Sequence, residues 1–80
     1  MLIHLSDFIK MRRKELKLSQ SYVADLAGIS LNTISKIERG EANPTVDVLD
    51  KIADVLGLEL KFEIKDIYKL RYAGGQDISE

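Results

Sequence analysis

The stretch that decides the fold reads SQSYVADLAGISLNTISKIERG, residues 19–40. Ser19 and Ser30 are of the type that caps helix N-termini, and Gly28 and Gly40 can adopt the positive φ that ends a helix. We therefore predict two short helices, one ending at Gly28 and the next at Gly40. The link between them is so short that the helices must cross steeply, which is the helix-turn-helix arrangement.

Helical spacing of apolar residues predicts one further helix on each side of this pair. The first begins near Leu5, with Ser6 as its N-cap, and its apolar positions are Leu5, Phe8, Ile9 and Leu16. The last follows its N-cap Thr45 and ends at Gly57. The expected inward side chains of the second, third and fourth helices are Val23, Ala24, Leu26, Ala27, Ile34, Ile37, Val48, Leu49, Ile52, Ala53 and Leu56.

The composition fits one small soluble domain. Of the 80 residues, 45% are hydrophobic and 31% are charged, which is typical of a globular chain rather than a disordered one. A chain this short buries only about two-thirds of its unfolded surface, so a monomer is marginally stable. The absence of cysteine excludes disulfides. Stability must therefore come from a helical core, from a dimer, or from both.

The net charge of −1 is unevenly distributed along the chain. Residues 1–40 carry seven Lys/Arg against four Asp/Glu, a balance of +3, whereas residues 41–80 carry five against nine, a balance of −4. The N-terminal half is thus the part able to face phosphates. This half contains a basic cluster that consists of Lys10, Arg12, Arg13 and Lys14. The cluster is either a solvated helix face or a surface near phosphates. Arg12 is the member that we assign to a phosphate contact.

The sequence offers no pattern for catalysis, for a metal or for a membrane. His4 stands alone, and Asp47, Asp50 and Asp54 fit a solvated helix face better than a metal site. No phosphate-binding glycine loop and no paired acid and base are present, so we predict neither an enzyme nor a cofactor. No run of 18 apolar residues occurs, and residues 1–10 lack a signal-peptide pattern. We expect a cytoplasmic protein without membrane contact.

The pattern changes at residues 58–65, LELKFEIK, where apolar and charged residues alternate. This period of two predicts a half-buried strand over residues 58–66. Its apolar face is Leu58, Leu60, Phe62 and Ile64, and its charged face is Glu59, Lys61, Glu63 and Lys65. Residues 67–80 follow as a tail, which we expect to be flexible after Gly75.

The partner of this strand is expected in a second copy, because the chain contains no other convincing strand. An antiparallel pair centred on Phe62 places Lys61 opposite Glu63 and Glu59 opposite Lys65. Every charged pair is then opposite in sign, and each contributes roughly 0.2–1 kcal/mol. The sequence therefore predicts a homodimer joined by a two-stranded ribbon.

The third predicted helix has an outward face of mostly short polar side chains. These outward residues are Leu31, Asn32, Thr33, Ser35 and Lys36. A helix of this kind can enter the DNA major groove, where asparagine pairs with adenine, lysine donates to guanine and leucine packs on the thymine methyl group. Base reading by this helix is the function that the residues themselves favour.

The chain resembles the Cro/C1-type (XRE-like) helix-turn-helix family over about residues 5–58, and the resemblance rests on residues 18–58, LSQSYVADLAGISLNTISKIERGEANPTVDVLDKIADVLGL. The resemblance implies a mostly helical, lambda-repressor-like bundle over residues 1–57 with double-stranded DNA as its partner. It assigns base reading to Leu31, Asn32 and Lys36, flanked by Thr33 and Ser35. It assigns phosphate contacts to Ser19, Gln20 and Asn43. It also implies a structural ion pair between Arg13 and Glu38.

A single strand directly after the helices is similar to the HipB-type antitoxins and to stand-alone repressors of the same layout. Two functions are thereby implied: a homodimeric, autoregulatory repressor on a palindromic operator, or an antitoxin whose main role is binding a HipA-like kinase toxin. Tyr22 stands where the family often has an acid. Its role stays open between packing, a contact to the DNA backbone and a contact to a protein partner.

Overall fold

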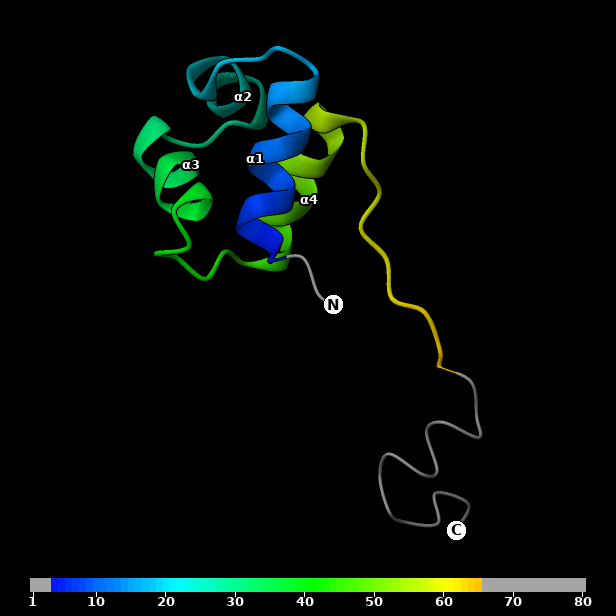
Figure 1. The fold of residues 1–80 in the computed structure, drawn as a ribbon. Helices are drawn as coiled ribbons and strands as arrows, with labels where there is room; N and C mark the ends of the chain where they lie inside the picture. Colours follow the sequence, from blue (N-terminus) through cyan, green and yellow to red (C-terminus); the bar gives the residue numbers. More distant parts are fainter. Residues whose placement is uncertain (1–3, 66–80) are drawn as a thin grey trace, which may run out of the picture.

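Four helices joined by short turns form the fold in the computed structural model, which describes residues 4–65 (Figure 1). They are α1 (Leu5–Glu15), α2 (Gln20–Ala27), α3 (Leu31–Glu38) and α4 (Val46–Leu56). Helix α2 packs against both α3 and α4, while α1 packs against α3. The three residues 28–30 connect α2 to α3, so the predicted helix-turn-helix is confirmed.

Three helices begin at the capping side chains that the sequence supplies. Ser19 Oγ accepts from the backbone N–H of Tyr22 at 3.0 Å, and Thr45 Oγ1 accepts from that of Val48 at 3.1 Å. Ser30 caps α3 in the same way. These bonds satisfy N–H groups that have no partner inside the first turn of a helix.

Helix α1 starts differently, and the prediction of Ser6 as its cap is wrong. His4 is the N-cap residue and makes no side-chain capping bond, whereas Ser6 already lies within the helix. The reason is that the His4 carbonyl oxygen accepts the first helical bond, from Phe8 N at 3.0 Å. The other end of α1 turns at Lys17, the only non-glycine residue with a positive φ (59°) among residues 4–65.

The core lies where α2, α3 and α4 meet, and α1 contributes Ile9 to it. Its buried apolar members are Ile9, Val23, Ala24, Ala27, Ile34, Ile37, Ile52, Ala53 and Leu56. Leu26 was predicted to face inward and does not, because the residue is 58% exposed. At about 100° per residue, Leu26 lies about 200° around α2 from the buried Ala24. A two-turn helix packed mainly through one face leaves that side to solvent.

The apolar spacing of α1 likewise overstates its burial. Leu5, Phe8 and Leu16 remain exposed, although Leu5 and Phe8 line an apolar groove of about 170 Å³. The other wall of this groove comes from α4 and from the chain that follows it, through Leu49, Leu58 and Leu60.

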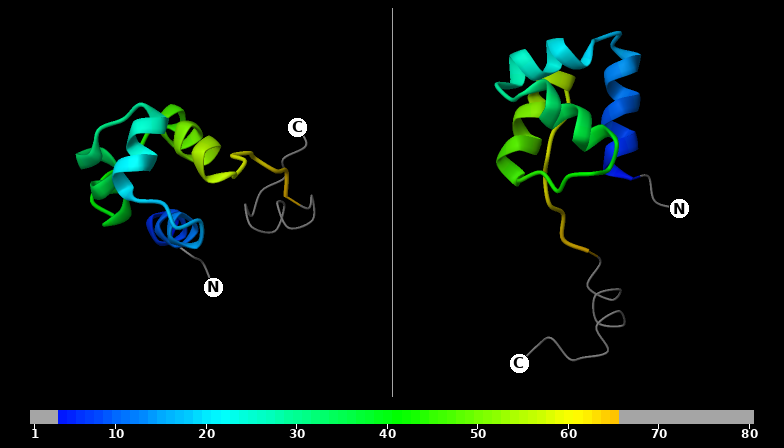
Figure 2. Two further views of the ribbon diagram at one scale, coloured as in Figure 1. Left: turned by 90° about the horizontal axis from the view of Figure 1, so that it is seen from above. Right: turned by 90° about the vertical axis from the view of Figure 1, so that its left-hand side faces the viewer.

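Residues 58–65, here called the extension, leave the end of α4, contribute Leu58 and Leu60 to this groove and then run away from the helices (Figures 1 and 2). They form neither a helix nor a strand ladder within the single chain. Phe62 and Ile64 are 96% and 97% exposed. The predicted strand therefore has no partner among residues 4–65. Residue 66 of that strand and the predicted tail, residues 67–80, lie outside the described residues.

Candidate nucleic-acid interface

Helix α3 is held by its apolar side and presents a polar side to solvent. Ile34 and Ile37 are almost completely buried, which fixes the orientation of the helix against α2. Leu31, Asn32 and Lys36 are exposed, as the sequence predicted. The side chains of Asn32 and Lys36 make no hydrogen bond within residues 4–65. The structure thus brings three of the five predicted base-reading residues together on one accessible surface.

The remaining two predicted base-reading residues are half-buried and have local hydrogen bonds. Thr33 Oγ1 lies 2.8 Å from Ser30 Oγ, so its hydroxyl belongs to the cap at the start of α3. Ser35 Oγ accepts from Nη1 of Arg39. Both residues therefore support the exposed surface from its edge.

Arg39, the C-cap residue of α3, completes this surface and was missed by the sequence reasoning. It lies seven positions after Asn32 and three after Lys36, so the helical repeat places it on the same face. Its Nη2 also bonds Glu41 Oε1 at 3.1 Å. The spacing from Asn32 could have identified Arg39, but the outward face of the predicted helix was taken to end at Lys36.

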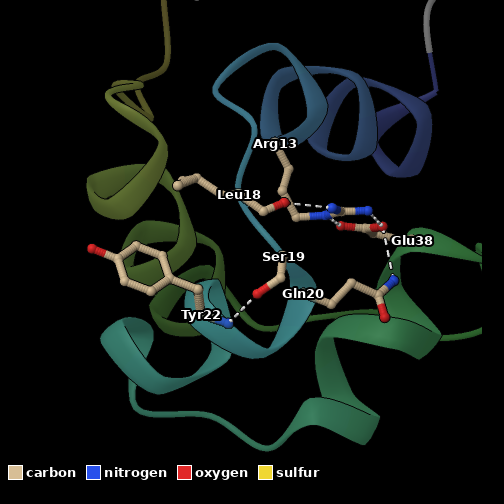
Figure 3. Close-up of polar contacts among 6 residues, drawn as sticks. All are labelled: Arg13, Leu18, Ser19, Gln20, Tyr22 and Glu38. Atoms are coloured by element: carbon tan, nitrogen blue, oxygen red, sulfur yellow. Dashed lines mark hydrogen bonds and ion pairs between the residues drawn. The ribbon is translucent and has the colours of Figure 1, made fainter.

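A buried ion pair connects α1 to the end of α3, and the prediction that paired Arg13 with Glu38 is confirmed. Arg13 Nε and Nη2 donate to Glu38 Oε2 and Oε1 at 2.6 and 2.9 Å (Figure 3). Arg13 Nη1 also donates to the carbonyl oxygen of Leu18 at 2.7 Å. The side chains of Arg13 and Glu38 are only 10% and 2% exposed.

Gln20 joins this network at the start of α2, donating from Nε2 to Glu38 Oε1 at 3.0 Å. Burial raises the pKa of Glu38, but the hydrogen bonds from Arg13 and Gln20 outweigh burial and hold that pKa below its ordinary value of 4.5. The bond to Glu38 raises the pKa of Arg13. Glu38 therefore stays ionised and fixes the ends of three helices relative to one another.

The predicted phosphate contacts are placed unevenly. Ser19 is exposed at the N-terminus of α2, and Asn43 is exposed in the loop between α3 and α4. Gln20 is partly committed to Glu38, although its amide nitrogen carries a second N–H. Tyr22 is half-exposed with its ring pointing away from the ion pair, which excludes a role in the core (Figure 3).

Arg12 does not lie with the other candidates. Its Nε donates to the carbonyl oxygen of Leu56 at 2.9 Å, and its Nη1 lies 3.6 Å from Glu15 Oε1. Arg12 therefore binds the C-terminal end of α4, which carries free carbonyl groups. In the view of Figure 1, this end of α4 and α3 lie to either side of α1. The structure thus separates Arg12 from the α3 surface.

Among residues 4–65, no group of three or more His, Asp or Glu side chains is placed to hold a metal ion. None of the helices in this part of the chain is long and apolar enough to cross a membrane.

The sequence matches the family described as helix-turn-helix over residues 9–62, which is more than half of the chain. The chain belongs to the Cro/C1-type helix-turn-helix family. This confirms the family resemblance of residues 18–58. The comparisons do not single out the HipB-type group within this helix-turn-helix family.

Two phage repressors are similar to this helix-turn-helix chain. The transcriptional repressor RstR of the cryptic phage CTXphi in Vibrio cholerae is 43% identical over 49 residues, 61% of this chain and 44% of RstR. The immunity repressor protein of Bacillus phage phi105 is 38% identical over 52 residues, 65% of this chain and 36% of that repressor. The chain thus spans less than half the length of either repressor.

A solved structure supports the same assignment. The crystal structure of SinR, the master regulator for biofilm formation, in complex with DNA matches with a TM-score of 0.67 and 35% sequence identity. The match covers 70% of this chain and 90% of that chain. The four-helix arrangement is therefore that of a known helix-turn-helix protein.

Proposed function

We propose that this protein is a sequence-specific, double-stranded-DNA-binding transcriptional repressor that reads base edges with α3. The observation that carries the proposal is the α3 surface. Leu31, Asn32 and Lys36 are exposed together, while Ile34 and Ile37 anchor the opposite side of the helix. The similarity to SinR in complex with DNA and to two phage repressors supports the same function.

The chemistry of these side chains suits the major groove. An asparagine amide can bind adenine through two hydrogen bonds, a lysine can donate to guanine O6 or N7, and a leucine can contact the thymine methyl group. Ser19, Gln20 and Asn43 would bind phosphates and fix the position of α3 on the duplex. The proposal contains no catalytic step, no cofactor and no membrane contact, and it places the protein in the cytoplasm.

The proposal predicts that an Asn32→Ala/Lys36→Ala variant loses most of its sequence preference. Each base contact contributes about 1–3 kcal/mol of discrimination, so we expect at least a 30-fold weaker affinity for preferred DNA. Weak, salt-sensitive binding to random duplex should persist because phosphate contacts remain. Fluorescence anisotropy across a salt series would measure both, on DNA from upstream of the gene and on duplexes selected by the wild type from a random library.

The control for that experiment is Lys51→Ala, which removes one lysine from the exposed surface of α4. It should bind preferred DNA within about twofold of the wild type, because Lys51 lies outside the proposed interface. Equal affinity of the wild type for selected and scrambled duplexes would contradict base reading by α3.

The proposed repressor acts as a homodimer, and the extension supports this part of the proposal. Phe62 and Ile64 are almost fully exposed in the single chain, which is costly for large apolar side chains. Beside Phe62, an apolar hollow is lined by Val46, Leu49 and Leu60, and it shares Leu49 and Leu60 with the groove over Phe8. Antiparallel pairing of two extensions centred on Phe62 would cover these side chains with a second copy.

The charged residues of the extension give a test of this register. Lys61 and Glu63 lie 3.4 Å apart within one chain and are both exposed. In the proposed ribbon they would face Glu63 and Lys61 of the second copy. We expect Lys61→Glu to weaken the dimer about tenfold, because it places like charges opposite each other twice. A Lys61→Glu/Glu63→Lys double variant should restore the wild-type dimer in sedimentation equilibrium, and a lack of rescue would rule out this register.

A dimer of this kind carries two α3 helices. It would address two half-sites about one helical turn apart in a palindromic operator. Occluding a promoter, including its own, would then repress transcription. The chain spans less than half of each phage repressor, so this part of the proposal rests on the extension and not on that similarity.

The second candidate function is an antitoxin that binds a HipA-like kinase toxin. Tyr22 and Leu26 favour it, because they lie one turn apart on α2 and are about half-exposed, forming an apolar surface outside the core. Co-purification with a HipA-like kinase encoded by a neighbouring gene, lost in a Tyr22→Asp/Leu26→Asp variant, would support this function. Retention of the kinase by that variant would count against it.

A further inference from the structure

The C-terminal end of α3 carries an acid next to its two exposed cations. Arg39 donates from Nη2 to Glu41 Oε1 at 3.1 Å, and both side chains are about half-exposed. The backbone N–H of Glu41 donates to the carbonyl oxygen of Lys36 at 2.9 Å, so the backbone at Glu41 is fixed to the last turn of α3. The carboxylate is thus held at the edge of the proposed DNA-reading surface.

Helix stability alone does not favour an acid at this position. The C-terminal end of a helix has partial negative charge, which favours cations and disfavours carboxylates. Within residues 4–65, Arg39 is the hydrogen-bond partner of the Glu41 carboxylate. The hydrogen bond and charge of Arg39, and to a lesser extent the charge of Lys36, hold the pKa of Glu41 below its ordinary value. Glu41 is therefore ionised at neutral pH and partly neutralises both cations.

The orientation of Arg39 also suits a phosphate. Its guanidinium is held by Ser35 on α3 as well as by Glu41, so it is fixed beside Lys36 at the surface. An arginine that binds a carboxylate through its planar edge can bind a phosphate by the same geometry. Glu41 thus occupies one of the positions that a phosphate oxygen would take.

We propose that Arg39 is a further DNA-phosphate-binding residue and that Glu41 competes with phosphate for it, which restrains sequence-independent binding. The inference rests on the proposed DNA-binding function and assigns an additional contact to the same surface. Sequence-independent affinity comes from neutralised phosphates, and each adds about 0.9 to the steepness of the salt dependence. A carboxylate of the protein that phosphate must displace from Arg39 lowers the sequence-independent affinity and leaves the base contacts unaffected.

The test compares four variants on a random-sequence duplex and on selected duplex, by fluorescence anisotropy across a salt series. Glu41→Gln should bind random duplex about three- to tenfold more tightly at low salt, with a salt slope steeper by up to about 0.9. Arg39→Gln should bind more weakly, with a shallower slope. The Arg39→Gln/Glu41→Gln double variant should bind random duplex less than about twofold more tightly than Arg39→Gln alone, because Glu41 acts through Arg39.

The matched control is Asp54→Asn, which removes one exposed carboxylate from α4 and changes the net charge by the same amount. It should stay within about twofold of the wild type, and circular dichroism would verify that all variants are folded. If the wild type prefers selected DNA but Glu41→Gln behaves like Asp54→Asn, the inference is overturned while the proposed function stands. A gain that persists without Arg39 overturns it as well. A wild type that binds neither duplex overturns both.

Discussion

Glu38→Gln should lower the free energy of unfolding by about 3 kcal/mol, a large share of the roughly 5 kcal/mol at the lower end of the range for natural domains. The glutamine presents one oxygen and one NH₂ group, so Arg13 would keep a buried charge without a carboxylate. The bond from Gln20 to Glu38 Oε1 would also be weakened. Urea denaturation followed by circular dichroism, at fixed protein concentration, would measure the loss.

The control for Glu38→Gln is Asp47→Asn, which breaks an ion pair of the same chemical type on the surface. Asp47 and Lys51 lie 3.2 Å apart on successive turns of α4, and their side chains are 76% and 50% exposed. Exposed pairs of this kind contribute at most about 1 kcal/mol to the free energy of unfolding, so the midpoint of urea denaturation should hardly move. An equal effect of the two substitutions would show that burial does not strengthen the Arg13–Glu38 interaction.

The buried pair of Arg13 and Glu38 also makes the free energy of unfolding depend on pH. The folded pKa of Glu38 lies below its ordinary value of 4.5, so between these two values the unfolded chain binds the proton more readily. Its contribution to stability is therefore complete above pH 4.5 and is lost as the pH falls through the folded pKa. Glu38→Gln should show a shallower loss of stability than the wild type over this acidic range.

Phe62→Asp should weaken the proposed homodimer by at least about a hundredfold. In the proposed ribbon the two Phe62 side chains meet on the two-fold axis. Burial of each aromatic side chain contributes about 1.5–3 kcal/mol, and the change occurs in both copies. Two carboxylates would also face each other across the axis. Sedimentation equilibrium of the wild type and the variant would measure the change.

The fold should survive this substitution, because Phe62 is 96% exposed in the single chain. Tyr22→Asp serves as the matched control, since it replaces an exposed aromatic on α2 by the same acid. It should leave the dimer intact. A wild type that stays monomeric at high concentration, or a Phe62→Asp variant that dimerises as well as the wild type, would contradict pairing through the extension.

The boundaries of α2, α3 and α4 could be predicted because they depend on local chemistry. Ser19, Ser30 and Thr45 each accept a backbone N–H within three residues, and such a bond needs no other part of the chain. Gly28 and Gly57 end their helices at φ values of 73° and 69°, which residues with a Cβ atom rarely adopt. The burial of Ile34 and Ile37 could also be predicted, because their spacing of three residues places them on one face of a helix.

Other features depend on contacts between distant segments, and the sequence pattern could not reveal them. The exposure of Leu26 depends on which face of α2 packs against α3 and α4. The contact of Arg12 with Leu56 joins residues 44 positions apart, so a cluster of basic residues gave no sign of it. The pairing of Arg39 with Glu41 is local, but the predicted reading face stopped at Lys36 and left both residues out.

The bond from Arg12 to Leu56 has a consequence for operator geometry. It ties the last turn of α4 to α1, and α1 is tied to the end of α3 through Arg13 and Glu38. The direction in which the extension leaves the domain is therefore fixed relative to α3, the helix that we propose reads DNA. In a dimer built through the extension, this angle determines how many base pairs separate the two half-sites. Arg12 would thus influence which operators a dimer can span while contacting neither DNA nor the second copy.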